Sequence, residues 1–267
     1  MPRTGVQTMI VKRDFLYTPK GENRPLHIYL PEGYDATDER YPVMYFFDGH
    51  NLFLDADATY GKSWGMKEFL DGWGKRMIVV GIECTHVGQE RLSEYLPYPA
   101  AKGSRFEVFE PTGKATMDWI VEEIKPFIDK NYRTIPFREC TGIAGSSMGG
   151  LMSLYAAVHY NRWFSKAGCV SSSIGICMEP LMADMKASAI SADTRVYLSW
   201  GTNEAFGLAD PTREDTTSRT YGWNKEAADY LKDQGCAVKM ECQVGGHHCE
   251  ADWEKLVPSF MNFLWTE

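Results

Sequence analysis

The amino-acid sequence predicts an α/β protein whose mostly parallel central sheet is covered by helices on both faces, with an antiparallel hairpin at one edge. Three observations support this fold class. Short apolar segments alternate along the chain with longer segments whose apolar residues recur at helical spacing. Most of the short segments are apolar on both sides, as in strands buried within a parallel sheet. A turn rich in Pro, Gly and Asn separates the first two strand-like segments, which is typical of a hairpin.

The elements follow in order along the chain. The hairpin is predicted to pair residues 9–17 with residues 26–30 across a turn at residues 18–25. Further strands are predicted at residues 43–47, 77–82, 140–145, 166–171, 195–200 and 236–244. Helices are predicted around the apolar stripes at residues 117–128, 151–158, 223–231 and 253–264. Pro126 lies within the first stripe, which continues beyond it, so we expect a kinked helix there. Repeated strand–helix units build a parallel sheet, and a (β/α)₈ barrel of similar length would lack the opening hairpin.

Composition and charge restrict the possible functions. Of 267 residues, 44% are apolar and 24% are charged, which is typical of a globular protein rather than a disordered one. The 28 Lys and Arg residues against 36 Asp and Glu residues give a net charge of −8, so we expect no nucleic-acid or membrane partner. No linker or internal repeat divides the sequence, and one domain spanning residues 1–267 is predicted. The sequence leaves the oligomeric state open.

The compartment is predicted from the N-terminus and the cysteines. The opening residues, MPRTGVQTMIVKRD, lack the apolar core of a signal peptide. Seven scattered cysteines, without a CxxC pair, indicate reduced thiols rather than a disulfide framework. We therefore expect a cytoplasmic protein.

Two connections are too long to be simple links between neighbouring elements. They span residues 83–113 and 201–220, and each leaves from the carboxyl end of a predicted strand. Long connections usually carry function, and ligands of open α/β sheets bind beyond the carboxyl ends of the strands. The sequence therefore places a binding site under these two segments.

The strongest local motif is the segment Gly145–Gly150, GSSMGG, which contains the pattern G-x-S-x-G around Ser147. The pattern is common by chance, but here it comes directly after a predicted strand and directly before a predicted helix. In such a turn the neighbouring glycines allow a tight bend that exposes the serine in a strained conformation. The N-terminus of the following helix points its N–H groups at the place where an oxyanion would form. A glycine-rich turn that only packs a helix on the sheet is the alternative.

A nucleophilic serine needs a base and an acid that orients the base. On a strand–turn–helix motif of this kind the order along the chain is serine, acid, histidine. Beyond Ser147, a predicted strand end carries His247 and His248, in the segment GGHHCE. Glu204 follows the predicted strand at residues 195–200 and is placed to be the orienting acid. The pattern itself does not distinguish between the two histidines.

The chain resembles the Putative esterase family of the α/β-hydrolase superfamily, which includes esterase D, feruloyl and acetyl-xylan esterases, siderophore esterases and mycolyltransferases. The resemblance runs from Tyr41–Phe53 (YPVMYFFDGHNLF) through Ile124–Thr134 (IKPFIDKNYRT) and the GSSMGG turn to the final H-C-E-x-x-W. It implies an α/β-hydrolase fold with its sheet, helices and edge hairpin as predicted, and hydrolysis of esters without a cofactor.

The resemblance also implies roles for single residues. Family members place the catalytic histidine five positions before a tryptophan, which selects His248 because Trp253 follows it at that distance. His247 is then expected to line the turn. Members of the feruloyl type often carry Asp where this chain has Glu204, so Asp210 remains the alternative acid.

The same resemblance implies an oxyanion hole, and the aromatic residues suggest a substrate pocket. The oxyanion hole would combine the amide of Met148 with that of His50, which follows a DG pair after a strand. Aromatic residues in or near the long connections are expected to form an acyl or aryl pocket, although ordinary loop packing explains them equally well: Trp64, Tyr95, Tyr98, Phe106 and Phe109. An acidic protein with an aromatic rim suggests neutral or weakly polar esters.

No metal or nucleotide site is expected. The metal-ligating residue types at positions 247–250 are adjacent and cannot all converge on one ion, and zinc-binding spacings such as HxxxH are absent from the sequence. Residues 56–63 lack a glycine of the phosphate-binding loop, and no GxGxxG occurs.

The sequence therefore predicts a serine carboxylic-ester hydrolase that acts on small acyl or aryl esters, of the acetyl or feruloyl type and including carbohydrate-linked ones, through an acyl-enzyme. Ser147 would be the nucleophile, His248 the base and Glu204 the orienting acid. Two alternatives remain: an acyltransferase of the mycolyltransferase type, in which an alcohol replaces water, and a catalytically silent scaffold that only binds a ligand. The sequence does not identify the acyl group or the alcohol.

Overall fold

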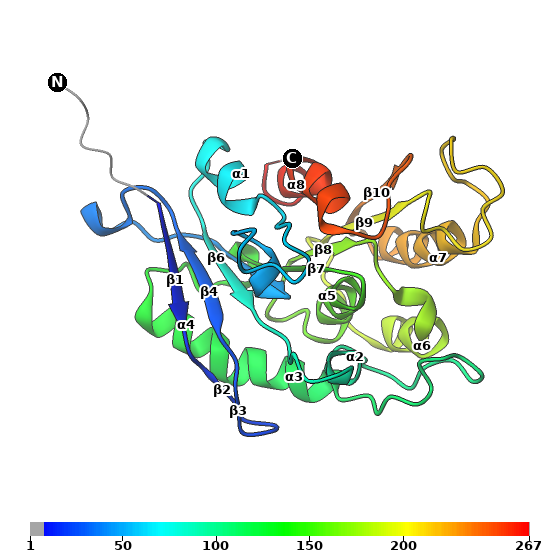
Figure 1. Ribbon diagram of the computed structural model, residues 1–267, viewed down its shortest axis with the longest axis horizontal. Coiled ribbons are helices and arrows are strands. Elements are labelled where there is room, and N and C mark those ends of the chain that lie inside the picture. The colour runs from blue at the N-terminus through cyan, green and yellow to red at the C-terminus, as the bar shows by residue number, and fades with distance from the viewer. Residues whose placement is uncertain (1–7, 267) are drawn as a thin grey trace.

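An eight-stranded sheet in the order β1-β4-β6-β5-β7-β8-β9-β10 forms the centre of the molecule (Figure 1). The structure, a computed structural model, describes residues 8–266. Its strands are β1 (Met9–Arg13), β4 (Leu26–Leu30), β5 (Val43–Phe47), β6 (Ile78–Ile82), β7 (Thr141–Ser146), β8 (Lys166–Val170), β9 (Arg195–Gly201) and β10 (Ala237–Gln243). The six strands from β6 to β10 in this order run parallel, so their carboxyl ends lie at one edge of the sheet. The predicted fold class is confirmed.

The antiparallel hairpin also lies where it was predicted, with one difference. β1 pairs antiparallel with β4, and β4 pairs antiparallel with β6. The first strand of the hairpin ends at Arg13 rather than at residue 17. Residues 16–23 instead form a second, two-stranded sheet of β2 (Leu16–Tyr17) and β3 (Glu22–Asn23). The ring of Tyr17 is buried beside Trp119 at 4.8 Å, so this small sheet covers a helix rather than extending the large one.

The helices cover both faces of the sheet. They are α1 (Met66–Gly72), α2 (Glu90–Glu94), α3 (Gly113–Trp119), α4 (Lys125–Asn131), α5 (Met148–His159), α6 (Met178–Ala187), α7 (Arg219–Asp233) and α8 (Glu250–Trp265), and short 3₁₀ turns occur at η1 (Tyr34–Ala36), η2 (Gly49–Asn51), η4 (Arg138–Cys140) and η5 (Ile174–Ile176). The four predicted helices are present. The helices α1, α2 and α6 were not predicted, because none of them carries a long apolar stripe.

Pro126 does not end its helix. A π-helical turn, η3 (Ile120–Ile124), joins α3 to α4, and Pro126 lies in the first turn of α4. A π turn shifts the hydrogen-bond register and often marks an irregularity within a helix. The helical stripe therefore continues through residue 126, as the sequence predicted.

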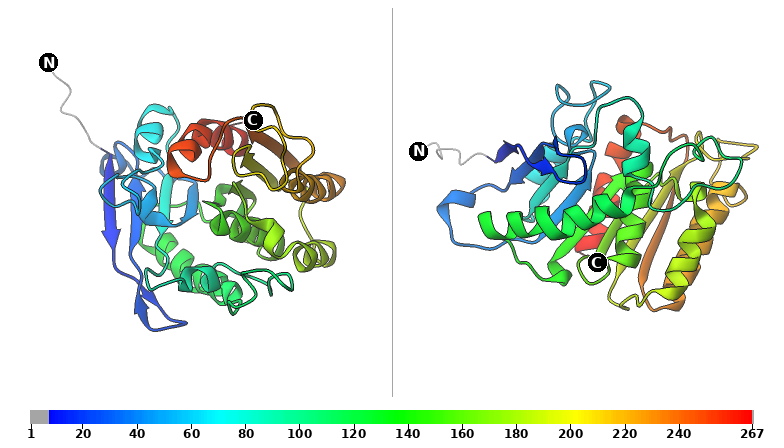
Figure 2. Two further views of the ribbon diagram at one scale, coloured as in Figure 1. Left: turned by 45° about the vertical axis from the view of Figure 1, so that its right-hand side comes forward. Right: turned by 90° about the horizontal axis from the view of Figure 1, so that it is seen from below.

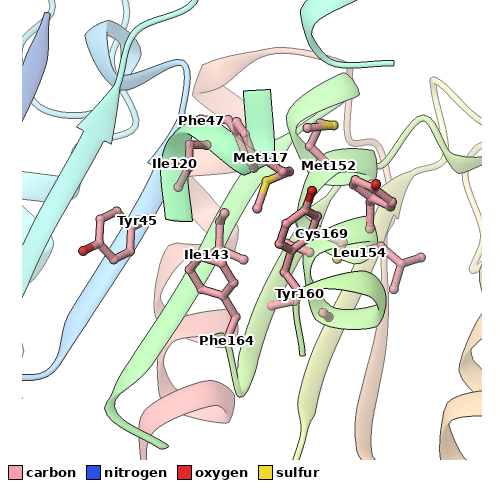
Figure 3. Packing of buried hydrophobic residues seen from close by; sticks show 14 of the residues in the cluster. Tyr45, Phe47, Met117, Ile120, Ile143, Met152, Leu154, Tyr160, Phe164 and Cys169 are labelled. Carbon is pink, nitrogen blue, oxygen red and sulfur yellow. The ribbon is translucent and has the colours of Figure 1, made fainter. Parts of the chain in front are cut away.

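The strand β5 shows how the sheet divides two apolar cores. Val43, Tyr45 and Phe47 lie in one core, while Met44 and Phe46 lie in the other. Figure 3 shows the first core, in which Phe47 lies near Ile120 of the η3 turn and Met117 of α3. The second core is formed with α1 and α8, which lie on the opposite side of the sheet (Figures 1 and 2). Burial on both faces explains why this strand reads as a continuous apolar run.

Two of the expectations concerned an export signal and a membrane partner. Residues 1–7, which contribute to the expected absence of an export signal, lie outside the described residues. Among the described helices, none combines the length and the apolar character that a membrane crossing requires.

Candidate active site

Ser147 lies in a sharp turn between β7 and α5. Its backbone has φ 58° and ψ −121°, a conformation that is strained for a residue with a side chain. Steric hindrance excludes larger residues at the flanking glycines. A Cβ on Gly145 would come within 2.8 Å of the backbone of Gly149, and a Cβ on Gly149 within 2.9 Å of the Cβ of Phe47. The turn therefore has the geometry that the G-x-S-x-G pattern predicts.

The turn is fixed by the neighbouring strand β8. The amide of Ser147 donates to the carbonyl of Val170 at 3.0 Å, and the amide of Ser173 donates to the carbonyl of Ser147 at 3.0 Å. The hydroxyl Oγ of Ser147 lies 3.3 Å from the Oγ of Ser173. Both serines line a cavity of about 1070 Å³ at the carboxyl edge of the sheet.

Glu204 and His248 lie in contact on the same cavity wall. Glu204 follows β9 and His248 follows β10, and the Oε2 of Glu204 forms a short hydrogen bond with the Nδ1 of His248. The other carboxylate oxygen accepts from the amide of Gly201 at 2.7 Å and from the hydroxyl of Ser171 at 2.5 Å. The carboxylate is thus held from two sides while it faces the imidazole, as an orienting acid requires.

A further pair of residues supports this arrangement. The indole N–H of Trp253 donates to the Oγ of Ser171 at 2.9 Å, and Ser171 itself has a positive φ of 44°. The ring of Trp253 also meets the ring of His248 edge to face, with centroids 5.0 Å apart. Ser171 was not predicted as a site residue. The sequence did contain an indication, because three consecutive serines, at positions 171–173, lie at the carboxyl end of the strand predicted at residues 166–171.

The two alternative residues have other partners. His247 lies 3.1 Å through Nδ1 from Asp252 and 3.0 Å through Nε2 from Asn203. Burial opposes ionisation of Asp252, but hydrogen bonds from Lys255 and from His247 lower its pKa to about 2. Asp210 accepts from the amide and the hydroxyl of Thr212 at 3.0 and 2.6 Å. Neither His247 nor Asp210 is among the described residues that line the cavity.

Exchanging the acid tests this assignment. Glu204→Gln keeps the shape of the side chain but removes its charge, and should lower kcat roughly 10²-fold because the imidazole loses the partner that orients and stabilises its protonated form. The matched change Asp210→Asn should leave kcat within about twofold, since Asp210 bonds only within its own loop. Steady-state kinetics with a p-nitrophenyl ester measures both. A large loss in Asp210→Asn with little loss in Glu204→Gln would assign the acid to Asp210.

His248 and Ser147 line the same cavity but are not hydrogen-bonded to each other. Within residues 8–266, the side-chain partner of the Ser147 hydroxyl is Ser173, and the His248 side chain is 42% exposed. Hydrogen bonds between catalytic groups are often long in the absence of substrate.

The loop after β5 is held rigidly beside the turn at Ser147. Asp48 has a positive φ of 57°, and a Cβ on Gly49 would come within 2.2 Å of the backbone of Gly81. Burial raises the pKa of the Asp48 carboxyl, but the charge and hydrogen bonds of Arg91, which binds both carboxylate oxygens at 2.6 Å, act together with His50 and Cys84 to leave this pKa lowered. His50 follows in the 3₁₀ turn η2, with its ring directed to Thr59 at 2.9 Å. The ionised pair thus fixes the loop that carries the amide of His50.

The predicted aromatic pocket must be corrected. Trp64 is buried against Phe46 and Trp253 in the second core, because its ring packs where α8 meets the sheet. Tyr95 is buried, and its hydroxyl accepts from the amide of Asp48 at 3.2 Å. Tyr98 bonds to Asp184. Trp64, Tyr95 and Tyr98 are not among the described residues lining the cavity, whereas the other two expected aromatic residues are. The aromatic wall is formed by Phe106, Phe109, Trp200, Phe206 and Trp223.

The charge of the cavity wall also differs from the charge of the whole chain. Glu204 contributes a carboxylate to the wall, whereas Arg91, Arg105 and Arg219 contribute guanidinium groups. Arg91 is paired with Asp48. Within the described part of the chain, Arg105 and Arg219 have no carboxylate partner within 4 Å, and Arg105 stacks over the ring of Phe106 at 4.8 Å. The expectation of neutral or weakly polar esters rested on the net charge and the aromatic residues, whereas the wall itself is locally cationic.

Comparisons with known proteins identify the family of this chain. The family model described as "Putative esterase" matches residues 19–263. The chain is 29% identical to the protein YbbA of Bacillus subtilis over 187 residues, which cover 69% of this chain and 70% of YbbA. It is also 29% identical to Esterase Rv1288 of Mycobacterium tuberculosis over 147 residues, 54% of this chain and 28% of that protein.

A solved structure shows the same fold. The crystal structure of an IroE-like serine hydrolase from Shewanella oneidensis has a TM-score of 0.71 at 18% identity, covering 96% of this chain and 79% of the other. The likeness establishes the α/β-hydrolase fold, and the family match extends over nearly the whole sequence. The chain therefore belongs to the esterase family described as "Putative esterase".

Proposed function

We propose that this esterase is a serine carboxylic-ester hydrolase whose nucleophile is Ser147, whose base is His248 and whose orienting acid is Glu204. The observation that carries the proposal is the Glu204–His248 contact on the wall of the cavity that Ser147 also lines. The three groups follow the carboxyl ends of β7, β9 and β10, three strands of the parallel part of the sheet, in the chain order expected for this fold. A glycine-rich packing turn would not require such a contact.

The mechanism follows from these positions. Ser147 Oγ attacks the ester carbonyl carbon while its proton passes to Nε2 of His248, and Glu204 stabilises the resulting imidazolium through Nδ1. The amide of Met148, at the N-terminus of α5, and the amide of His50 donate to the oxyanion. The tetrahedral intermediate expels the alcohol, which takes the proton from His248 and leaves an acyl-enzyme. Water then attacks the acyl-enzyme by the same steps and releases the acid.

The cavity wall suggests the substrate class. Five aromatic side chains provide flat apolar surface for an aryl group, and Arg105 and Arg219 provide positive charge. A volume of about 1070 Å³ is larger than an acetyl group needs. We therefore propose aryl esters that carry a negative charge as preferred substrates. The name of the structurally similar IroE-like serine hydrolase is compatible with ester hydrolysis by a serine.

A fluorophosphonate probe tests the proposed chemistry. The probe should label the protein once, on Ser147, as shown by intact mass and peptide mapping. Hydrolysis of a panel of p-nitrophenyl esters with increasing acyl length, together with methyl ferulate, would then measure the acyl preference. Addition of a competing alcohol separates hydrolysis from acyl transfer, because a transferase would form the new ester as its main product. An unlabelled, inactive protein would favour the silent scaffold.

The charge preference can be tested at Arg219. Arg219→Gln should raise KM for an ester bearing a carboxylate about three- to fivefold and leave KM for its neutral methyl ester unchanged, because an exposed ion pair contributes up to about 1 kcal/mol. Arg213→Gln is the matched control, since Arg213 is also exposed but pairs with Asp210 outside the cavity. Equal effects of Arg219→Gln on both esters would contradict a charge preference.

A further inference from the structure

A cluster of three metal-ligating side chains lies beside the active site, on the loops that follow β5 and β6. His50, Cys84 and His86 each offer one ligand atom, and these atoms lie within 4.8 Å of one another. The two imidazole rings meet with centroids 4.7 Å apart. Cys84 and His86 are two positions apart, but His50 comes from a separate loop, so the sequence did not predict this cluster.

One nitrogen of each histidine already has an oxygen partner. The Nε2 of His50 lies 2.9 Å from the hydroxyl of Thr59, and the Nε2 of His86 lies 3.0 Å from the carboxylate of Glu83. Metal-binding histidines have this arrangement, in which one ring nitrogen bonds to an oxygen and orients the other nitrogen toward the metal. The Nδ1 of His50 is buried and has no hydrogen-bond partner within the described residues, which is costly for a polar atom unless it binds something.

The third member supplies a soft ligand. Cys84 is buried directly after β6, and burial followed by the negative charge of Asp48 raises the pKa of its thiol well above the usual value. A thiol that binds zinc loses its proton. The proton of Cys84 would pass to solvent when the metal binds, and the resulting thiolate would be balanced by the cation.

We propose that His50, Cys84 and His86 form a binding site for Zn²⁺, with a water molecule as the fourth ligand. Two imidazoles and one thiolate form a ligand set that zinc prefers. Tetrahedral ligands of zinc lie roughly 3.3–3.8 Å apart, given Zn–N and Zn–S bonds of about 2.0–2.3 Å. The site must therefore contract by about an ångström. His86 can make this movement, because its side chain is 58% exposed, and its exposure also opens a path from solvent.

The location of the site gives the ion a structural role. His50 belongs to the loop whose amide is proposed to bind the oxyanion, and residues 84–86 begin the long segment that contributes Phe106 and Phe109 to the cavity. A bound ion would link the two loops. None of the three side chains takes part in the proposed triad, so metal binding can be measured separately from ester hydrolysis.

Cobalt(II) provides a spectroscopic test on the full chain after treatment with a chelator. Co²⁺ should bind in one equivalent, with visible bands of tetrahedral cobalt and a near-ultraviolet thiolate-to-cobalt band, and Zn²⁺ should displace it. Cys84→Ser should remove the thiolate band. His86→Ala, at an exposed position that does not threaten folding, should weaken Co²⁺ affinity at least about tenfold. Zn²⁺ should also raise the unfolding temperature of the wild type and not that of Cys84→Ser.

Two further cysteines serve as controls. Cys140→Ser removes a thiol at the opposite edge of the sheet and should leave the cobalt spectrum unchanged. Cys249→Ser tests the competing cluster in which Cys249 and His247 contact Asp252. Loss of the thiolate band in Cys249→Ser with its retention in Cys84→Ser would overturn the proposal. So would unchanged Co²⁺ affinity in His86→Ala, or no binding of Co²⁺ by the wild type.

Discussion

Replacing Ser147 by alanine should lower kcat by on the order of 10³-fold or more while leaving the fold intact. The reason is that the acyl-enzyme cannot form without the hydroxyl, so only the activity provided by binding and the oxyanion donors would remain. Alanine is the smallest change available at this position, where the positive φ already strains the backbone. Circular dichroism and the unfolding temperature check the fold, and steady-state kinetics measures the loss.

Ser173→Ala is the matched control for Ser147→Ala. Its hydroxyl lies 3.3 Å from that of Ser147 and lines the same cavity, but it lies outside the strained turn. Removing it should change kcat less than about tenfold, and the fluorophosphonate probe should still label the protein. If Ser173→Ala abolishes labelling and Ser147→Ala does not, the nucleophile is Ser173 and the proposed mechanism is wrong.

The strands of the sheet could be predicted because a strand that is buried on both faces has apolar residues on both sides. The strand Val43–Phe47 is apolar on both sides, and both sides are covered by helices in the structure. The same holds for the strand Ile78–Ile82. Short helices such as α2, Glu90–Glu94, could not be predicted in this way, because a single helical turn is too short to show a periodic apolar pattern.

The candidate site was predictable where backbone geometry dictates the residue. The glycines around Ser147 are required by contacts of less than 3 Å, so the motif itself specifies the turn. The aromatic residues lack such a constraint. Nothing in the sequence around Trp64 or Tyr95 distinguishes a ring that faces a cavity from one that packs in the core, because that depends on elements far away in the chain. Trp64, for example, is buried by Trp253 and Phe260 of α8.

The charge of the cavity wall could not be predicted from the sequence either. The net charge of −8 is a sum over the whole chain, whereas a substrate responds mainly to groups within about a Debye length, roughly 8–10 Å. Arg105 and Arg219 come from two different long segments and reach the same cavity only through the fold. Their effect on specificity therefore follows from the tertiary structure and not from composition.

Replacing His248 by alanine should reduce kcat by on the order of 10³-fold or more, as large an effect as that of Ser147→Ala, because nucleophile and base act as one unit. Reaction with the fluorophosphonate probe should slow as well, since the hydroxyl of Ser147 would no longer transfer its proton to an imidazole. The adjacent His247 provides the matched control. It is bound to Asp252 and Asn203 rather than to Glu204, so His247→Ala should cost less than about tenfold.

Added imidazole separates a missing base from a damaged fold. In His248→Ala the small base can enter from solvent, because the native ring is 42% exposed, and it can occupy the space between Ser147 and Glu204. Activity should then recover in part and saturate with imidazole concentration, whereas Ser147→Ala should show no recovery. Rescue requires that Glu204 still accept a hydrogen bond at that position, so the double variant with Glu204→Gln should recover less. Two outcomes would assign the base to His247 instead: a loss of activity in His247→Ala equal to that in His248→Ala, or a rescue by imidazole confined to His247→Ala. The base would then not be the histidine that lies beside the carboxylate of Glu204.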